Sequence, residues 1–487
     1  MQKYLLAIDQ GTSSTRAMIY TLSGQLIAVS QYDILQFYPK IGWVEHCPEE
    51  IWTKTLQAIK DVTEQIDKNK LIACGITNQR ETTLIWDKQT GQCLYPAIVW
   101  QDRRTEDFCN SLDKVLIKKK TGLFPDPYFS ASKLWWLLKN CPQAQKLASC
   151  YNLAFGTIDS FLIWRLTKGA VHATDITNAS RTLMFNIFKQ TWDHELLDLF
   201  EVNPTILPAV KACDDHFGTT DKALLGFSIP ITGVAGDQQA ALVGQRCIDD
   251  GMIKATYGTG AFLLMNTGNR PINSANLITT IAYKIKGQLT YGLEGSIYDA
   301  GTTIKWLRDE LKLLTCAAES EELAKSIKSN EGVYLIPSFN GLGAPYWLTT
   351  SGAIILGLTR TSNRAHLARA ALESICYQTR QVLECMQSDS NLEMKILRVD
   401  GGMTVNRWLL QFLASQCQLS VQRPKDIETT AQGAALLAAI GCGELTSIKA
   451  LKQSWQVEHE CLPETNYEQI ELNFKGWLKA ISSLIAQ

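Results

Sequence analysis

The stretch YLLAIDQGTSSTRAMIYTLSGQLIAVSQ occupies residues 4–31 and contains three apolar runs separated by two polar turns. The runs cover residues 4–8, 17–21 and 25–31, and the turns lie at Asp9 to Arg16 and at Ser23-Gly24. Short apolar runs bounded by Gly, Ser and Thr are typical of β-strands joined by turns. We therefore predict an antiparallel meander that opens an α/β domain.

Further strand and helix signals follow along the chain. Residues 71–76, 229–235, 255–257 and 397–399 are apolar runs that each end in a polar or glycine-rich turn. Helices are predicted to begin at Pro48, after Gly236 and at Asn406, and over residues 133–138 and 431–441; the last is rich in Gly and Ala and could pack closely against a backbone. This alternation predicts an α/β chain of two large lobes, which we divide near residue 246 into 1–246 and 247–487.

Composition excludes several classes of protein. The 487 residues are 46% hydrophobic and carry a net charge of -1, so neither a nucleic-acid partner nor an anionic membrane is expected. The longest uncharged stretch, residues 332–359, is interrupted by Pro and Gly, and the first apolar run is too short for a secretory leader. The fourteen cysteines form no CxxC pair, which predicts reduced thiols and a cytoplasmic protein.

Three glycine-containing turns at strand ends are candidate phosphate sites. They are residues 11–15, 258–260 and 401–402, and Arg16 adds positive charge beside the first. Glycine lets backbone N–H groups approach a phosphate closely, although a plain tight turn is the simpler interpretation of each one alone. None matches a P-loop or a GxGxxG motif. Asp9 could orient Mg²⁺ through water, since this ion usually retains several waters.

A second set of polar residues is suited to binding a small substrate with several hydroxyl groups. Arg80-Glu81 follows a strand, with Trp86 and Trp100 downstream, and Asp237-Gln238 follows another. A small polyol needs fixed donors and acceptors for its hydroxyls and apolar walls for its carbons. The alternatives are a surface ion pair for Arg80-Glu81 and a helix N-cap for Asp237.

A series of longer motifs runs from residue 6 to about residue 441. They are DQGT (9–12), GWVEH (42–46), GITNQRET (75–82), AIVWQ (97–101), DPYFS (126–130), TNASRT (177–182), AGDQQAA (235–241), TYGTG (256–260), GLGAPYW (341–347) and RVDGG (398–402). In these motifs the chain resembles the FGGY family of carbohydrate kinases. The segments NQRET and DPYFS favour members that act on glycerol over relatives that act on pentuloses or hexuloses.

This resemblance implies two lobes with an actin-like (ribonuclease H-like) ATPase fold and an active site in the cleft between them. It implies ATP-dependent phosphorylation of glycerol to sn-glycerol 3-phosphate in glycerol catabolism, with ATP and Mg²⁺ as cofactors and no insertion into membranes. The lobe 1–246 would carry the glycerol site and the phosphate loop, and the lobe 247–487 would bind the nucleotide. A homodimer or homotetramer is expected.

The resemblance also implies residue roles. Asp237 would be the general base, and Asp9 is our candidate for the metal. Glycerol would be bound by Arg80, Glu81, Tyr128, Asp237 and Gln238, with Trp100 and Phe262 against its carbons. The nucleotide would be held by Thr12, Ser13, Ser14, Arg16, Thr259, Gly301, Lys305, Gly402 and Asn406. Lys305 departs from close relatives, which have Gln at this position.

Two other functions stay open at this point. The first is an FGGY kinase for another polyol or ketose. The second, from a different class, is an actin- or Hsp70-like ATPase that moves a partner protein; the acceptor residues Arg80, Glu81, Tyr128 and Gln238 argue against it. Some bacterial members bind inhibitory fructose 1,6-bisphosphate through a loop containing Gly and Arg, but residues 220–228 contain no Arg, so we expect no such inhibition.

Overall fold

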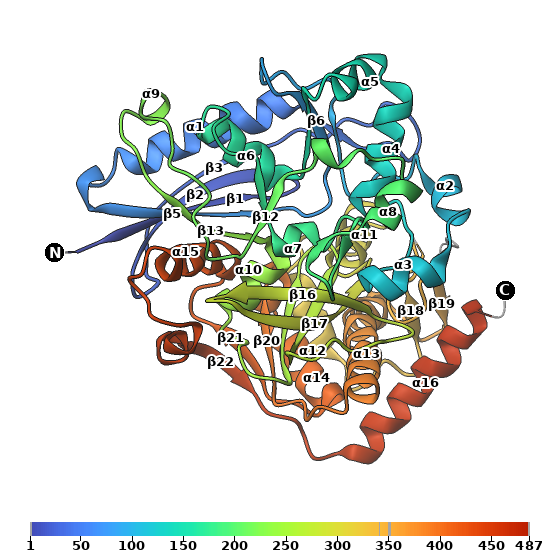
Figure 1. Cartoon of the computed structure of the whole chain (residues 1–487). Helices are drawn as coiled ribbons and strands as arrows, with labels where there is room; N and C mark the ends of the chain where they lie inside the picture. The colour runs from blue at the N-terminus through green and yellow to red at the C-terminus, as the bar shows by residue number, and fades with distance from the viewer. Residues whose placement is uncertain (1, 340, 349–351, 486–487) are drawn as a thin grey trace.

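Two β-sheets form the frame of the molecule in the computed structural model, which describes residues 2–339, 341–348 and 352–485 (Figure 1). The first sheet has the strand order β13-β5-β1-β2-β3. Its strands are β1 Tyr4–Gln10, β2 Ser14–Thr21, β3 Leu26–Asp33, β5 Leu71–Asn78 and β13 Ile231–Gly236. Strands β1, β2 and β3 pair antiparallel in succession, so the predicted meander is confirmed.

The second sheet follows later in the chain and has the order β16-β17-β15-β14-β20-β21-β22. Its strands are β14 Met252–Tyr257, β15 Ala261–Gly268, β16 Ile278–Ile285, β17 Gln288–Ile297, β20 Ile396–Asp400, β21 Val421–Pro424 and β22 Val457–Cys461. Here too three strands, β14, β15 and β17, pair antiparallel side by side, with β16 added at the edge beyond β17, and β20 adds in parallel beside β14. The two sheets therefore share one construction.

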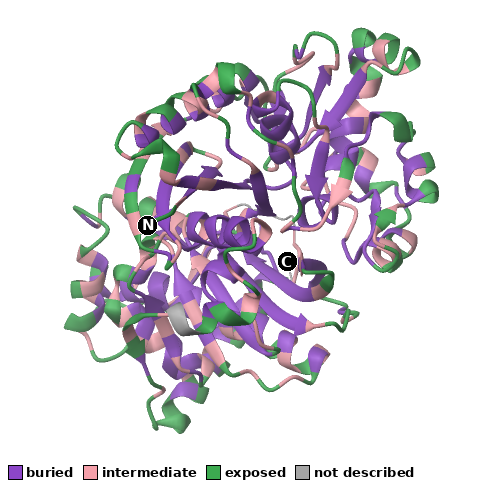
Figure 2. Cartoon of the chain, turned by 60° about the vertical axis from the view of Figure 1, so that its left-hand side comes forward, coloured by how far each residue is buried: buried purple, intermediate pink, exposed green. Residues whose placement is uncertain are grey.

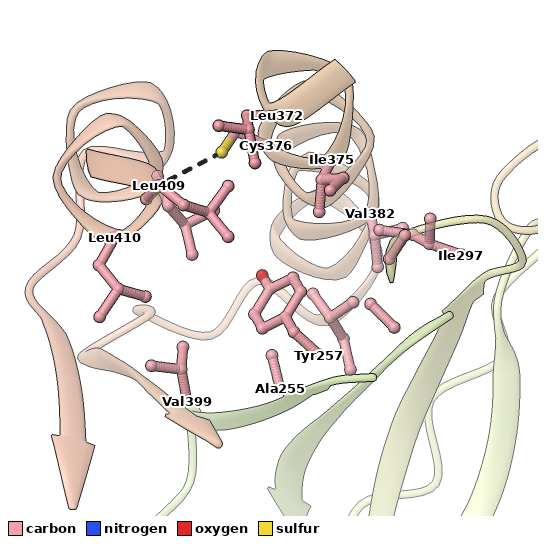
Figure 3. Packing of buried hydrophobic residues seen from close by; sticks show 14 of the residues in the cluster. Ala255, Tyr257, Ile297, Leu372, Ile375, Cys376, Val382, Val399, Leu409 and Leu410 are labelled. Atoms are coloured by element: carbon pink, nitrogen blue, oxygen red, sulfur yellow. Dashed lines mark hydrogen bonds between the residues drawn. The ribbon is translucent and has the colours of Figure 1, made fainter. Parts of the chain in front are cut away.

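Helices cover the sheets on the sides away from each other. On the first sheet, α1 (Pro48–Thr63) begins with proline and two acidic residues, as predicted, and buries Ile51 and Trp52. On the second sheet, α13 (Arg364–Ser390) and α14 (Arg407–Cys417) pack on one face. Figure 3 shows that contact, in which Tyr257 and Val399 from the strands meet residues of both helices.

Two helices lie between the sheets and bring them together. These are α10 (Asp237–Gly244), which opens with the predicted Gly-Asp-Gln-Gln turn, and α15 (Thr429–Gly441), the predicted Gly/Ala-rich helix. α15 packs on β1, β5 and β13 and also on α10. A Cβ on Gly433 would lie 1.9 Å from the carbonyl oxygen of Ala240, and one on Gly244 would lie 1.8 Å from that of Thr429. Only glycine allows the two backbones to approach this closely.

The remaining elements are shorter and surround this frame. Five two-stranded pairs are β4 (Glu45–His46) with β7 (Ala97–Ile98), β6 (Leu84–Asp87) with β8 (Leu153–Gly156), β9 (Ala173–Asp175) with β12 (Ala209–Lys211), β10 (Phe185–Asn186) with β11 (Thr191–Trp192), and β18 (Tyr334–Ile336) with β19 (Ile354–Leu356). The other helices are α2 Glu106–Asn110, α3 Lys114–Thr121, α4 Ser130–Asn140, α5 Pro142–Ser149, α6 Ile158–Leu166, α7 Ile176–Ala179, α8 His194–Leu199, α9 Lys222–Leu225, α11 Gly301–Asp309, α12 Glu319–Ser326 and α16 Tyr467–Ile485, and the 3-10 turns are η1 Lys68–Lys70, η2 Pro204–Ile206, η3 Gly402–Val405 and η4 Ile448–Ser454.

Burial follows this arrangement, since both sheets are mostly buried while the outer helices alternate buried and exposed residues (Figure 2). All fourteen cysteines are free thiols, as the sequence predicts. Across the described residues, no helix combines the length and the apolar character needed to cross a membrane.

Candidate active site

Three parallel strands of the first sheet end at the same edge, which gathers the polar segments identified in the sequence. Gln10 of β1 and Gly236 of β13 both lie in register with Asn78 of β5. The segments that follow these strands are the turn at residues 11–13, the segment at residues 79–82 and the start of α10. Because parallel strands point the same way, their carboxyl ends place these segments side by side.

The first turn is closed by its own backbone and tied to an aromatic residue. Gly11 N–H donates to the carbonyl of Ser14 (2.9 Å), and the carbonyl of Ser13 accepts from Ile34 N–H (2.8 Å). The Thr12 hydroxyl accepts a hydrogen bond from Trp100 Nε1 (2.9 Å). This bond connects the two predicted sites, because Thr12 is predicted to bind phosphate and Trp100 is predicted to contact glycerol.

The buried Asp9 pairs with the half-buried Arg16 beside this turn. Arg16 Nη2 lies 3.1 Å from Asp9 Oδ2, and Arg16 Nη1 lies 2.5 Å from Glu428 Oε2. Burial of Asp9, which is 4% exposed, raises its pKa to about 6; Arg16 opposes the rise, and the charge of Asp237 adds to it. A hydrated divalent cation would relieve the cost of these carboxylates, so the residues present fit Mg²⁺ at Asp9.

The residues predicted to bind a polyol lie together in the structure. Arg80 Nε lies 3.3 Å from Asp237 Oδ1, and Arg80 Nη2 donates to the Tyr128 hydroxyl (3.3 Å). The Trp100 ring meets the rings of Tyr128 and Phe262 edge-on, with centroids 5.5 Å and 6.4 Å away. The structure thus brings charged and aromatic members of the set into one cluster.

Glu81 also belongs to this cluster, and its backbone conformation is strained. Its φ is 63°, in the left-handed region, and Thr82 N–H donates to the Arg80 carbonyl (2.7 Å). A non-glycine residue in this region costs on the order of 1–3 kcal/mol and persists only where its surroundings hold it. Here Arg181 Nε donates to Glu81 Oε1 (2.6 Å), which fixes the side chain that the strained turn presents.

The functional residues that sequence analysis missed are charged side chains behind the cluster. Glu294, on β17, accepts from Nη1 and Nη2 of Arg80 (2.5 and 3.1 Å) and from Nη2 of Arg181 (2.9 Å). Burial would raise the pKa of Glu294, but Arg181 and Arg80 hold it at about 2. A lone carboxylate inside a buried strand was the signal that could have revealed Glu294, because such a residue requires a partner.

Two buried lysines support the same cluster, and the sequence analysis assigned neither of them a role in the site. Lys254, on β14, donates to the Gln238 side chain, to the Thr256 hydroxyl (3.1 Å) and to the Phe262 carbonyl (3.3 Å). Burial lowers the pKa of Lys254 to about 8. Lys133, on α4, donates to the carbonyls of residues 127, 128 and 129 at 2.6, 2.7 and 3.0 Å. It therefore holds the turn that presents Tyr128.

The other residues predicted to hold the nucleotide lie at and beside the strand ends of the second sheet. β14 and β20 are parallel, with Thr256 opposite Asp400, so the turns at residues 258–260 and 401–402 are neighbours. Gly301, the first residue of α11, donates its N–H to the Gly258 carbonyl (3.0 Å). A Cβ on Gly301 would lie 3.4 Å from the sulfur of Met403, which places the start of α11 beside η3.

Three further residues of the prediction occupy the same region. Thr259 is exposed in its turn, and its carbonyl accepts from Thr302 N–H (3.1 Å). Asn406 caps α14, with its side chain accepting from Leu409 N–H (2.9 Å). Lys305 is exposed on α11, four residues after Gly301.

Both alternatives considered from the sequence are wrong, and so is the suggestion that Trp86 belongs to the site. Arg80 and Glu81 are not a surface pair, because both are buried. Asp237 is not the helix N-cap; Gly236 is, and Asp237 is the first residue of α10. Trp86 does not line the site, because it is buried on β6 against Phe161 and Trp164.

Comparison with known proteins agrees with this architecture. Residues 4–244 match the N-terminal domain of the FGGY family of carbohydrate kinases, and residues 253–442 match its C-terminal domain. Two curated relatives named glycerol kinase, from Ectopseudomonas mendocina and Petrotoga mobilis, are 48% and 49% identical to this chain; each alignment covers 99% of the chain, and 99% and 98% of the respective relative.

A solved structure shares the whole fold. The crystal structure of Plasmodium falciparum glycerol kinase with ADP is 35% identical, covers 99% of this chain and 98% of its own, and superposes with a TM-score of 0.93. The predicted α/β fold with two actin-like lobes is confirmed by this match. The chain belongs to the FGGY family of carbohydrate kinases.

Proposed function

We propose that this protein transfers the γ-phosphoryl group of ATP to glycerol and forms sn-glycerol 3-phosphate. The observation that carries the proposal is the cluster in which Arg80 contacts both Asp237 and Tyr128, with Trp100 joining it to the Gly11 turn. A kinase needs an acceptor site directly beside its phosphate site. Full-length relatives named glycerol kinase support the same substrate.

In this proposal Asp237 is the general base. Its carboxylate takes the proton of the attacking hydroxyl while the new O–P bond forms and the bond from the γ-phosphorus to ADP breaks. Burial raises the pKa of Asp237, whereas Arg80 and Lys254 oppose the rise. Its side chain is 31% exposed, against 2% for Glu81 and 1% for Glu294, so Asp237 is the most exposed acidic group of the cluster.

Glycerol would lie against Arg80, Glu81, Tyr128 and Gln238, with Trp100 and Phe262 packing on its carbons. The two rings meet edge-on and give an apolar wall that does not compete for hydrogen bonds. A site built to hydrogen-bond each hydroxyl rejects analogues that lack one, because its buried charged groups would be left short of partners.

The nucleotide would span both sheets. Thr12, Ser13, Ser14 and Arg16 would hold its phosphates, and Thr259, Gly301, Lys305, Gly402 and Asn406 would hold the rest. Mg²⁺ held through water by Asp9 would neutralise charge on the phosphates when bound. The separate lobes 1–246 and 247–487, the homodimer or homotetramer and the cytoplasmic location belong to the same proposal.

A substrate panel tests the proposal directly. ADP formation from ATP is measured with glycerol, with xylitol, with xylulose and with no acceptor, and the phosphorylated product is identified. We expect rapid ADP formation with glycerol alone and sn-glycerol 3-phosphate as the product. Faster turnover of a pentitol or ketose would overturn the substrate, and hydrolysis that does not respond to any acceptor would favour the partner-driven ATPase.

A further inference from the structure

Glu294 uses one of the two edges with which arginine recognises carboxylates, the edge formed by Nη1 and Nη2 of Arg80. Arginine has five N–H donors, and each of its two edges, Nη1 with Nη2 and Nε with Nη2, presents two N–H groups that match the two oxygens of a carboxylate. In this protein Nη1 and Nη2 of Arg80 donate to the two oxygens of Glu294 at 2.5 and 3.1 Å. Arg80 therefore already carries a carboxylate partner, supplied by the protein from β17.

The other donors of Arg80 are also directed to protein groups. Nη1 donates to Gln239 Oε1 (3.4 Å), Nη2 donates to the Tyr128 hydroxyl (3.3 Å), and Nε faces Asp237 Oδ1 at 3.3 Å. A ligand can share the outward contacts to Tyr128 and Asp237, which are partly exposed, but not the buried contact to Glu294. What Arg80 offers a substrate is single hydrogen bonds of the kind that hydroxyls accept.

The positive charge of Arg181, the second arginine of the cluster, is also balanced by carboxylates of the protein. Arg181 Nε donates to Glu81 Oε1 (2.6 Å), and Arg181 Nη2 donates to Glu294 Oε1 (2.9 Å). The charges of Arg80 and Arg181 are thus balanced by those of Glu81 and Glu294, all four of them buried. The remaining charges are Asp237 and Lys254, and the ammonium of Lys254 is directed to Gln238, Thr256 and Phe262.

We propose that Glu294 is a specificity-determining residue, which makes the acceptor site select an uncharged polyol over the corresponding acid. It fills one carboxylate-binding edge of Arg80, and the carboxylate of Asp237 faces Nε on the other, so neither edge is left free to hold an anionic acceptor. An acid in the site would instead meet the charges of Glu81 and Asp237. Specificity of this kind comes from a repulsive element as much as from an attractive one. The inference rests on the proposed phosphorylation of glycerol.

Removing the charge of Glu294 should therefore change which ligands bind. In Glu294→Gln, Arg80 and Arg181 together carry one uncompensated positive charge beside the substrate. The probe is glycerate, in which one CH₂OH group of glycerol is a carboxylate, measured as a competitive inhibitor against glycerol. The matched control is Glu49→Gln, since Glu49 also holds an arginine with two hydrogen bonds, to Arg165 at 2.6 and 2.9 Å, but at the surface.

For Glu294→Gln we expect the ratio of the glycerate Ki to the glycerol KM to fall by at least about tenfold, which corresponds to about 1.4 kcal/mol. The affinity for ADP should stay within about twofold, and Glu49→Gln should leave the ratio unchanged. An unchanged ratio in Glu294→Gln, or an equal loss of glycerol and ADP binding, would overturn the inference.

Glu294→Asp keeps the inference testable if the glutamine variant does not fold. Aspartate retains the charge but is one methylene shorter, so it should raise the glycerol KM while the site still rejects glycerate. A gain in glycerate affinity in this variant would overturn the inference. Failure of the proposed function is a separate result, because it would appear in the wild-type protein as absence of glycerol-dependent ADP formation.

Discussion

Asp237 Oδ1 lies 3.3 Å from Nε of Arg80 and also accepts the N–H of Gln238 at 2.7 Å. Arg80 is buried, whereas Asp237 reaches the surface of the cluster. The arginine therefore stands behind the carboxylate and orients it, and the helix start supplies a second fixed donor. A general base needs such orientation, because proton transfer requires hydrogen-bond distance to the reacting hydroxyl.

Replacement of this carboxylate should affect the chemical step. Asp237→Asn keeps the side chain's shape but removes the proton acceptor. We expect kcat for glycerol phosphorylation to fall by about 10²–10⁴-fold, the usual contribution of a general base, while nucleotide affinity and melting temperature stay near wild type. The control is Asp221→Asn, at the N-cap of α9, where asparagine caps as well as aspartate. If Asp237→Asn kept more than about a tenth of the wild-type kcat, the base would have to be another residue.

Alanine substitutions at two adjacent glycines should have different effects, one on stability and the other on nucleotide binding. A Cβ on Gly401, whose φ is 90°, would lie 2.4 Å from the Tyr257 carbonyl oxygen, whereas one on Gly402 would meet no atom within 4 Å. Gly401→Ala should lower the melting temperature, since the backbone must shift. Gly402→Ala should fold like wild type and raise the KM for ATP, because the methyl group takes space in the proposed nucleotide site. Thermal melts and ATP titrations of both variants measure this, and normal ATP use by a stable Gly402→Ala would contradict the assignment of Gly402.

The lysine beneath Tyr128 should matter for both stability and glycerol. Lys133→Met removes an ammonium that donates to three carbonyls of the turn at residues 127–129. Buried acceptors without partners cost about 1–3 kcal/mol each, so we expect a clear loss of unfolding free energy together with a higher KM for glycerol. Lys139→Met on the same helix is the control, because Lys139 is exposed and its partner Glu201 lies at the surface. Equal effects of the two substitutions on denaturant unfolding would show that Lys133 does not hold the turn.

Fructose 1,6-bisphosphate should not inhibit this enzyme through residues 220–228. That segment forms the four-residue helix α9, capped by Asp221, and offers Lys222 as its one cationic side chain. A ligand with two phosphates needs guanidinium groups or clustered N–H donors. The measurement is glycerol-dependent activity over a range of bisphosphate concentrations, in wild type and in Lys222→Ala. Strong inhibition that Lys222→Ala abolishes would contradict this expectation.

The sequence alone predicted the features that depend on neighbouring residues. The meander of β1 to β3 follows from apolar runs separated by Gly, Ser and Thr, and the start of α10 follows from a glycine turn after a buried strand. The tight contact of α15 could also be anticipated, because a helix rich in Gly and Ala has no side chains to keep another backbone away. Long motif matches in addition predicted the family.

Only the tertiary structure decided which charges meet. Glu294 is 214 positions from Arg80, and no local pattern relates a carboxylate in the middle of β17 to an arginine after β5. Trp86 and Trp100 look equally suited to a site in the sequence, but one is packed in the core and the other binds Thr12. Turns and strand periodicity are set by residues close in the chain, whereas the balance of buried charge is set by residues of two different sheets that only the complete fold brings together.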